Sequence, residues 1–118
     1  MTGRKVATPA GIRLCLFDDL PEPGARGFTV ETAAGPFQGF AVRKHGKIHG
    51  FVDRCPHMGL PLAWKPHAYL TPRADFMMCS RHGALFTIED GRCVGGPCVG
   101  YALARWPLEI CDGWVVTL

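Results

Sequence analysis

The sequence predicts an all-β protein built from small antiparallel sheets. Apolar residues alternate with polar ones in several short stretches, and turn dipeptides separate these stretches. No segment shows the i, i+3, i+4, i+7 apolar stripe of an amphipathic helix. The 118 residues include 15 glycines and 10 prolines, and such frequent turn residues favour short strands over long helices. The length is that of one domain.

Each expected strand is a short run with period-two alternation that is bounded by turn residues. In chain order, the expected strands are residues 12–17, 27–32, 37–43, 47–52, 76–79, 85–88, 106–111 and 114–118, with a loop over 19–24. His45-Gly46 is expected to be the turn of one hairpin, and Asp112-Gly113 the turn of the last. An Asp-Gly pair accepts the positive φ angles of a tight primed turn, so the C-terminal hairpin is the better defined of the two.

Composition and charge exclude several classes of function. The formal charge is +3 and the basic residues are scattered, so no basic stripe predicts a nucleic-acid partner. No apolar run approaches the ~18 residues that a membrane span needs. The N-terminal stretch has basic residues, but Pro9, Gly11 and Arg13 interrupt the apolar run that a secretory signal requires. We therefore expect a cytoplasmic protein with no membrane association.

The six cysteines indicate a metal site, because a chain without a secretory signal rarely uses them for a disulfide scaffold. Residues 53–98 contain four of the six cysteines and three of the five histidines. The flanking segments consist of ordinary strand sequence. We expect one domain over 1–118, in which a cluster-binding subdomain (about 53–98) is inserted in a β base (about 1–52 and 99–118).

Two short motifs carry the candidate ligands. Cys55 and His57 form a C-x-H motif, and after 21 further residues Cys79 and His82 form a C-x-x-H motif. Two thiolates and two imidazoles suit structural zinc. They suit equally a [2Fe–2S] cluster in which two cysteines bind one iron and two histidines the other. Each motif supplies one ligand of each kind, which favours two loops that enclose a cluster.

These motifs resemble those of Rieske ferredoxins. The resemblance rests on the CPHMG and CSRHGALF boxes, the Asp90-Gly91 turn, the Gly96-Pro97 segment and the ending ARWPLEICDGWVVTL, and it covers residues ~50–118. It implies a Rieske-type iron–sulfur fold with one [2Fe–2S] cluster. Cys55 and Cys79 would bind the inner iron, and His57 and His82 the outer one. Backbone N–H groups of residues 58–60 and 82–84 would point at the sulfurs.

The resemblance also implies an electron carrier rather than an enzyme. A Rieske ferredoxin passes single electrons from a reductase to a terminal oxygenase, and these redox proteins are the expected partners. An oxygenase itself would need a second iron site of two histidines and a carboxylate, for which the chain has no room. A small Rieske-type subunit of a larger redox enzyme, similar to that of nitrite reductase, is the alternative. A zinc-stabilised interaction module is a third reading.

The remaining cysteines are interpreted as thiols rather than ligands. Cys15 and Cys111 alternate with apolar residues, so both are expected to be buried. Cys93 and Cys98 flank the Gly96-Pro97 segment, where a disulfide is conceivable but free thiols are favoured in the cytoplasm.

Other residues are assigned by their neighbourhood. Trp64 and Phe86 are expected to pack in the core, and residues 64–75 to form an extra loop of unassigned role. Met58, Leu60 and Pro97 form a candidate apolar collar around the histidines. Such a collar could equally pack in the core or dock a partner.

Departures from the high-potential members of the family predict a low reduction potential. Those members carry a disulfide where this chain has Leu60 and Arg81, and a serine hydroxyl that donates to a cluster sulfur where this chain has Ala84. With fewer donors the reduced state is stabilised less. We expect a redox titration to give a value in the lower part of roughly −150 to +300 mV. A value near the top would contradict this reasoning.

Overall fold

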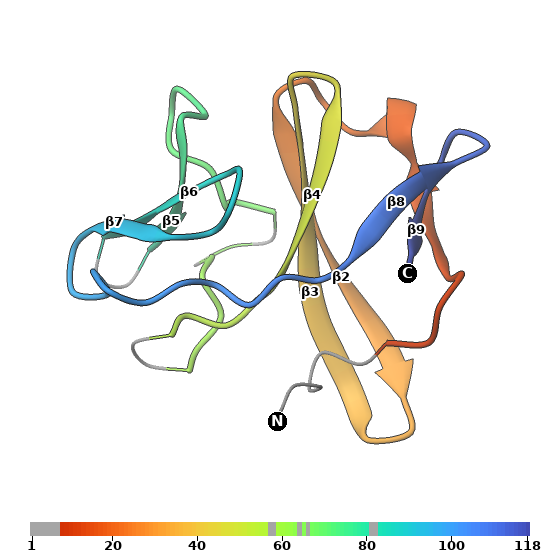
Figure 1. The fold of residues 1–118 in the computed structure, drawn as a ribbon, viewed down its shortest axis with the longest axis horizontal. Helices are drawn as coiled ribbons and strands as arrows, with labels where there is room; N and C mark the ends of the chain where they lie inside the picture. Colours follow the sequence, from red (N-terminus) through yellow and green to blue (C-terminus); the bar gives the residue numbers. More distant parts are fainter. Residues whose placement is uncertain (1–7, 57–58, 64, 66, 81–82) are drawn as a thin grey trace.

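The computed structural model describes residues 8–56, 59–63, 65, 67–80 and 83–118. In this part of the chain the regular structure is β throughout, apart from one 3-10 turn, η1(Phe17–Asp19), which confirms the predicted fold class. The strands form three antiparallel sheets of three strands each. Figure 1 shows one sheet in the middle of the molecule, with another on each side of it.

The central sheet consists of β2 (Gly24–Thr32), β3 (Gly35–Lys44) and β4 (Lys47–Val52), in that order. His45 and Gly46 join β3 to β4 with φ angles of 54° and 71°. Positive φ at both turn positions matches the twist of the two strands, so the predicted hairpin is confirmed.

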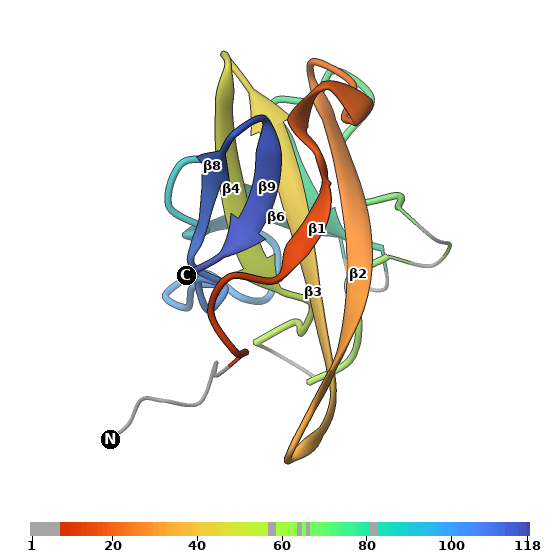
Figure 2. The ribbon, with the colours of Figure 1, turned by 90° about the vertical axis from the view of Figure 1, so that its right-hand side faces the viewer.

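The second sheet joins the two ends of the chain. β1 (Arg13–Leu16) pairs with β9 (Trp114–Thr117), which also pairs with β8 (Leu108–Cys111). Figure 2 shows this sheet in front of the central one. Asp112 and Gly113 form the predicted turn, with φ angles of 51° and 82°.

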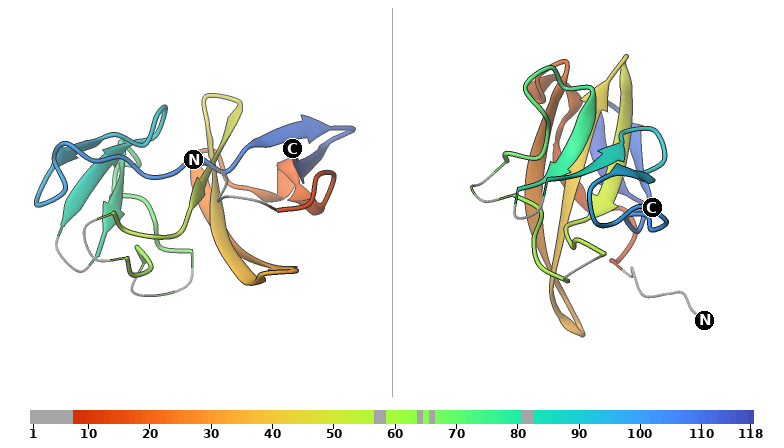
Figure 3. Two further views of the ribbon diagram at one scale, coloured as in Figure 1. Left: turned by 60° about the horizontal axis from the view of Figure 1, so that its bottom comes forward. Right: turned by 90° about the vertical axis from the view of Figure 1, so that its left-hand side faces the viewer.

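The third sheet lies on the other side of the central one, as both views in Figure 3 show. It contains β5 (Phe76–Cys79), β6 (Ala84–Thr87) and β7 (Cys93–Gly95). The sequence did not predict β7, because three residues are too few to show an alternation.

The central sheet is covered on both faces, as the pattern of buried residues on β3 shows. Residues 39–42 of β3 are all buried, whereas a strand with one solvated face would alternate. Phe40 belongs to a core that includes Met77 and Phe86 of the third sheet. Gly39 lies against Trp106, whose ring would be 2.4 Å from an added Cβ. A smaller core contains Cys15, Leu20 and Val115.

Some expectations need correction. The first strand ends at Leu16 because Phe17 enters η1, and β2 begins at Gly24 rather than at residue 27. Cys15 is buried as predicted. The prediction for Cys111 was wrong: it is exposed, because it ends the edge strand β8, where most residues face solvent. No helix in the described part of the chain is long and apolar enough to cross a membrane.

Candidate metal centre

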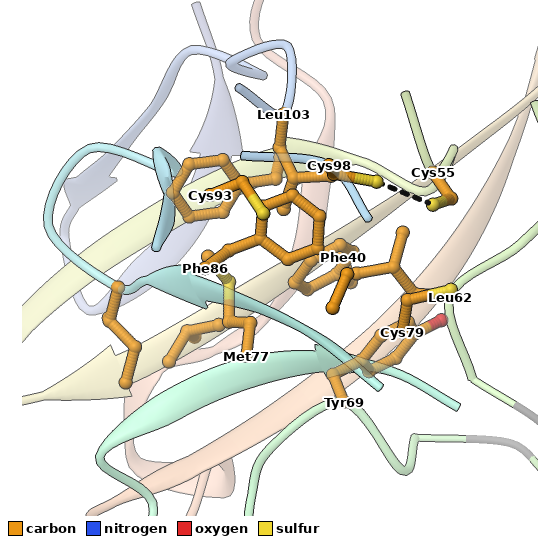
Figure 4. Close-up of a cluster of buried hydrophobic side chains, with 14 residues drawn as sticks. Phe40, Cys55, Leu62, Tyr69, Met77, Cys79, Phe86, Cys93, Cys98 and Leu103 are labelled. Atoms are coloured by element: carbon orange, nitrogen blue, oxygen red, sulfur yellow. Dashed lines mark hydrogen bonds between the residues drawn. The ribbon is translucent and has the colours of Figure 1, made fainter. Parts of the chain in front are cut away.

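The two predicted thiol ligands lie at one border of the main core. Cys79 is the last residue of β5, and Cys55 follows β4 after two residues. Both are buried, at 1% exposure for Cys55 and 0% for Cys79. Figure 4 shows both on the same side of the core that Phe40 and Phe86 fill. The structure thus brings together the two cysteines of the two motifs. His57 and His82, the predicted imidazole ligands, lie outside the described residues.

Both cysteines begin tight turns that are closed in the same way. The N–H of Gly59 donates to the carbonyl of Cys55 at 2.7 Å, and the N–H of Gly83 donates to the carbonyl of Cys79 at 2.9 Å. The two glycines have φ angles of 71° and 70°, which residues with a Cβ rarely adopt. These two amides were expected to point at cluster sulfurs. They serve instead to close the turns.

Asp53 and Leu62 fasten the two turns to each other. Asp53 Oδ1 accepts a hydrogen bond from the N–H of Leu62 at 2.9 Å. The carbonyl of Leu62 accepts in turn from the N–H of Ser80, the residue after Cys79, at 2.9 Å. Leu62 is fully buried in the main core. We call this chain of hydrogen bonds, Asp53–Leu62–Ser80, the loop fastening. It connects the two turns to each other.

Tyr69 holds Asp53 in place from the other side. Its hydroxyl donates to Asp53 Oδ2 at 2.8 Å, and its ring stacks on Phe40 at 4.1 Å between centroids. Burial, and then the hydrogen bond to Asp53, raises the pKa of this phenol far above its ordinary value, so the hydroxyl stays a neutral donor. Both oxygens of the Asp53 carboxylate thus have a donor.

The extra loop at 64–75 positions Tyr69 beside Asp53. His67 Nδ1 accepts a hydrogen bond from the N–H of Gly27 on β2 at 3.0 Å, which fixes the loop on the central sheet. An added Cβ at Gly27 would lie 2.4 Å from the Tyr69 hydroxyl, so a glycine makes room for Tyr69 here. In this position the Tyr69 hydroxyl can donate to Asp53. Trp64 of this loop lies outside the described residues.

The residues present fit a sulfur-rich group between the two turns. The hydroxyl Oγ of Ser80 is buried and has no hydrogen-bond partner in the described structure. A buried hydroxyl without an acceptor is costly by ~1–3 kcal/mol. A cluster sulfur bound at the neighbouring Cys79 would supply an acceptor. No three metal-ligating side chains converge among the described residues alone, a set that leaves out both predicted histidines.

The other cysteines near the site do not pair with each other. Cys93 is a free thiol that donates to the carbonyl of Gly95 at 3.1 Å. Cys98 is fully buried, and its Sγ lies 3.7 Å from the Sγ of Cys55. The interpretation of Cys93 as free is confirmed, and the conceivable Cys93–Cys98 disulfide is absent.

The candidate apolar collar is at the surface where the structure describes it. Leu60 is 36% exposed and Pro97 is also exposed, whereas Met58 lies outside the described residues. Val99, the second residue after Pro97, is 62% exposed. The intervening Cys98 contacts Cys55, so the segment that carries Pro97 and Val99 lies next to the first turn. Phe86, by contrast, is fully buried and packs in the core as predicted.

The loop fastening and its support by Tyr69 were not predicted from the sequence. Asp53, Leu62 and Tyr69 belong to no motif, and their contacts join residues 9 and 16 positions apart in the chain. One signal was available. Asp53 is an acidic residue two positions before Cys55, the start of the first motif, and a carboxylate so close to buried residues needs donors.

Asp53→Ala is expected to loosen the metal centre. It leaves the Leu62 N–H and the Tyr69 hydroxyl without their acceptor, and each such loss destabilises by ~1–3 kcal/mol. The iron should leave the protein faster, as measured by the bleaching of visible absorbance with a ferrous chelator. Asp53→Asn keeps one acceptor oxygen, so its rate of iron loss should lie between those of Asp53→Ala and the unmodified protein. Asp18→Ala is the control, because the Asp18 side chain is 96% exposed. Equal iron-loss rates in Asp53→Ala and the control would contradict the role of the loop fastening.

Comparisons with known proteins agree with this architecture. The structure is similar to the ferredoxin of carbazole 1,9a-dioxygenase from Nocardioides aromaticivorans IC177, with a TM-score of 0.72 and 16% identity over 92% of this chain and 97% of that chain. It is also similar to a chain in the complex of reduced oxygenase and oxidized ferredoxin in carbazole 1,9a-dioxygenase, with a TM-score of 0.69 and 20% identity over 90% of each chain.

A third similar structure is the terminal oxygenase of carbazole 1,9a-dioxygenase from Nocardioides aromaticivorans IC177. The TM-score is 0.69 at 22% identity, over 90% of this chain but only 29% of that chain. These three similarities show a shared fold. No curated protein sequence matches the chain. The family model of the Rieske [2Fe-2S] domain matches residues 12–107. The chain therefore belongs to the Rieske [2Fe-2S] domain family, whose members bind one [2Fe–2S] cluster.

Proposed function

We propose that this protein is a ferredoxin that passes single electrons from a reductase to a terminal oxygenase. In this proposal Cys55 and Cys79 bind one iron of the cluster, and His57 and His82 bind the other. The observation that carries it is the pair of buried thiols on two turns closed by the same hydrogen bond. The cluster, when bound, supplies a site that accepts and releases one electron.

The residues of the chain would hold the cluster rigidly and keep water from its inner side. The loop fastening ties the two turns together, and the fully buried Leu62 and Phe40 belong to the core beside them. A site that is held by packing and by hydrogen bonds beyond the ligands keeps its geometry during function. A carrier needs this rigidity and no substrate pocket. We therefore propose electron transfer rather than catalysis as the role.

The exposed apolar residues support a protein partner. A chain of similar fold occurs in a complex of reduced oxygenase and oxidized ferredoxin. In this protein Leu60, Pro97 and Val99 are exposed around the first turn. Apolar side chains at the centre of a small contact exclude water from it, which suits a transient redox complex. We propose this surface as the docking site for the oxygenase, in the cytoplasm.

Metal analysis tests the cluster and its ligands. The purified protein should contain two iron atoms and two acid-labile sulfides, and Cys55→Ala or Cys79→Ala should lose both. His57→Ala and His82→Ala should lose them as well, because an iron without its imidazole ligands is exposed to release. Cys111→Ala is the matched control, since this cysteine is exposed and distant from the site in the sequence. Zinc without sulfide would point to an interaction module, and a larger enzyme that co-purifies stably would point to a subunit.

Leu60→Glu tests the docking surface. A carboxylate that must lose its water in an apolar contact weakens binding, so the kcat/KM for reduction of the host's terminal oxygenase should fall about tenfold. The visible spectrum of the cluster should not change. Ile110→Glu is the control. It places the same charge on a residue of similar exposure on β8, which belongs to the sheet of the chain ends and not to the one next to the metal centre. It should leave the rate unchanged. Equal rates for both variants would exclude this surface as the docking site.

A further inference from the structure

A third buried thiol lies beside the site. Cys98 is fully buried, and its Sγ is 3.7 Å from the Sγ of Cys55, a separation at which one thiol can donate a hydrogen bond to the other (Figure 4). Neither motif includes Cys98, and the four proposed ligands leave it without a role. The contact comes from the segment after β7, far from Cys55 in the sequence.

The position of Cys98 is fixed from both sides. Its carbonyl accepts a hydrogen bond from the N–H of Tyr101 at 2.9 Å. Two residues before it, Gly96 lies so close to the second turn that an added Cβ would be 2.8 Å from the Cα of Ala84. The segment 96–98 therefore contacts the second turn through Gly96 and the first ligand through Cys98. This contact is part of the packing of the site.

Ligation settles which sulfur donates. In the chain without iron, either Cys55 or Cys98 could be the donor. Cysteine binds iron as the thiolate, so an iron-bound Cys55 has no proton to give. A thiol that binds no metal is mostly protonated at neutral pH. The hydrogen bond must then run from Cys98 to Cys55.

We propose that Cys98 is a positioning residue whose thiol donates a hydrogen bond to the iron-bound sulfur of Cys55 and raises the reduction potential. This inference rests on the proposed function, because it needs Cys55 to be a ligand. Reduction adds one negative charge, and the ligand sulfurs carry part of it. A donor to such a sulfur stabilises the reduced state more than the oxidised state. The S–H group is a weak donor, so the effect is modest.

Variants at position 98 separate hydrogen bonding from packing. Cys98→Ala removes the donor, and Cys98→Ser replaces it with a hydroxyl. Cys93→Ala is the matched control, because Cys93 is a buried thiol on β7, directly before this segment, that donates to a backbone carbonyl instead. Each protein is analysed for iron and sulfide and then titrated by spectroelectrochemistry. The potential is read from the cluster itself, so a failure of this proposal is distinguished from a failure of the proposed function, in which the unmodified protein would hold no cluster.

We expect all three variants to keep the cluster. In Cys98→Ala the equilibrium constant for reduction should fall by about three- to tenfold, where tenfold is about 59 mV for one electron. Cys98→Ser should recover most of this loss, and Cys93→Ala should match the unmodified protein. An unchanged potential in Cys98→Ala, or a Cys98→Ser potential as low as that of Cys98→Ala, would overturn the proposal. Loss of iron from both Cys98 variants would also overturn it, because Cys98 would then be needed to retain the cluster rather than to set its potential.

The S–H stretching band gives a second measurement that needs no alanine variant. The band of Cys98 is identified in the infrared spectrum by its absence in Cys98→Ser. It should move to lower frequency when the protein is reduced, since its acceptor then carries more negative charge. A band that stays at one frequency in both redox states would contradict the hydrogen bond to Cys55.

Discussion

The hydrogen-bond chain from Asp53 through Leu62 to Ser80 is the constraint on which the site depends. Cys55 follows β4 and Cys79 ends β5, and these strands belong to two different sheets, so the local backbone does not fix one cysteine relative to the other. The loop fastening does so through the backbone of Leu62. The N–H of Leu62 donates to the carboxylate of Asp53, and the carbonyl of Leu62 accepts from the N–H of Ser80. The side chain of Leu62 is buried at the same place, so packing and hydrogen bonding act on one residue.

This arrangement differs in kind from a covalent link. A disulfide between the turns would hold them together even in the unfolded chain, whereas the loop fastening exists only when the core is formed. The cohesion of the metal centre is thus coupled to the fold of the central sheet, on which Tyr69 stacks through Phe40. Separately, Ala84 has no hydroxyl to donate at the second turn. In our proposal the Cys98 thiol, on the segment after β7, supplies one weak donor to the sulfur of Cys55.

Local patterns allowed much of the fold to be predicted. The hairpins at His45-Gly46 and Asp112-Gly113 were predictable because the positive φ angles of their turns suit these residues. That Cys55 and Cys79 lie in one core was predictable, because two loops that enclose a common centre must bring their cysteines together. The buried state of Cys111 was predicted wrongly, because alternation does not reveal that β8 is an edge strand.

The rest of the site could not be predicted, since it depends on contacts between distant segments. Tyr69 reaches Asp53 from a loop that His67 attaches to β2. Cys98 meets Cys55 only because the segment after β7 returns to the first turn. No spacing rule joins these pairs, and they become visible only when the three sheets are assembled.

In the proposed site, the two turns hold a cluster whose two irons have different ligands. Mössbauer spectroscopy of the oxidised, iron-57-enriched protein tests this directly. An iron with four sulfur neighbours and an iron with two sulfur and two nitrogen neighbours have different electronic environments. We predict two quadrupole doublets of equal area. A single doublet, from two equivalent irons, would contradict it.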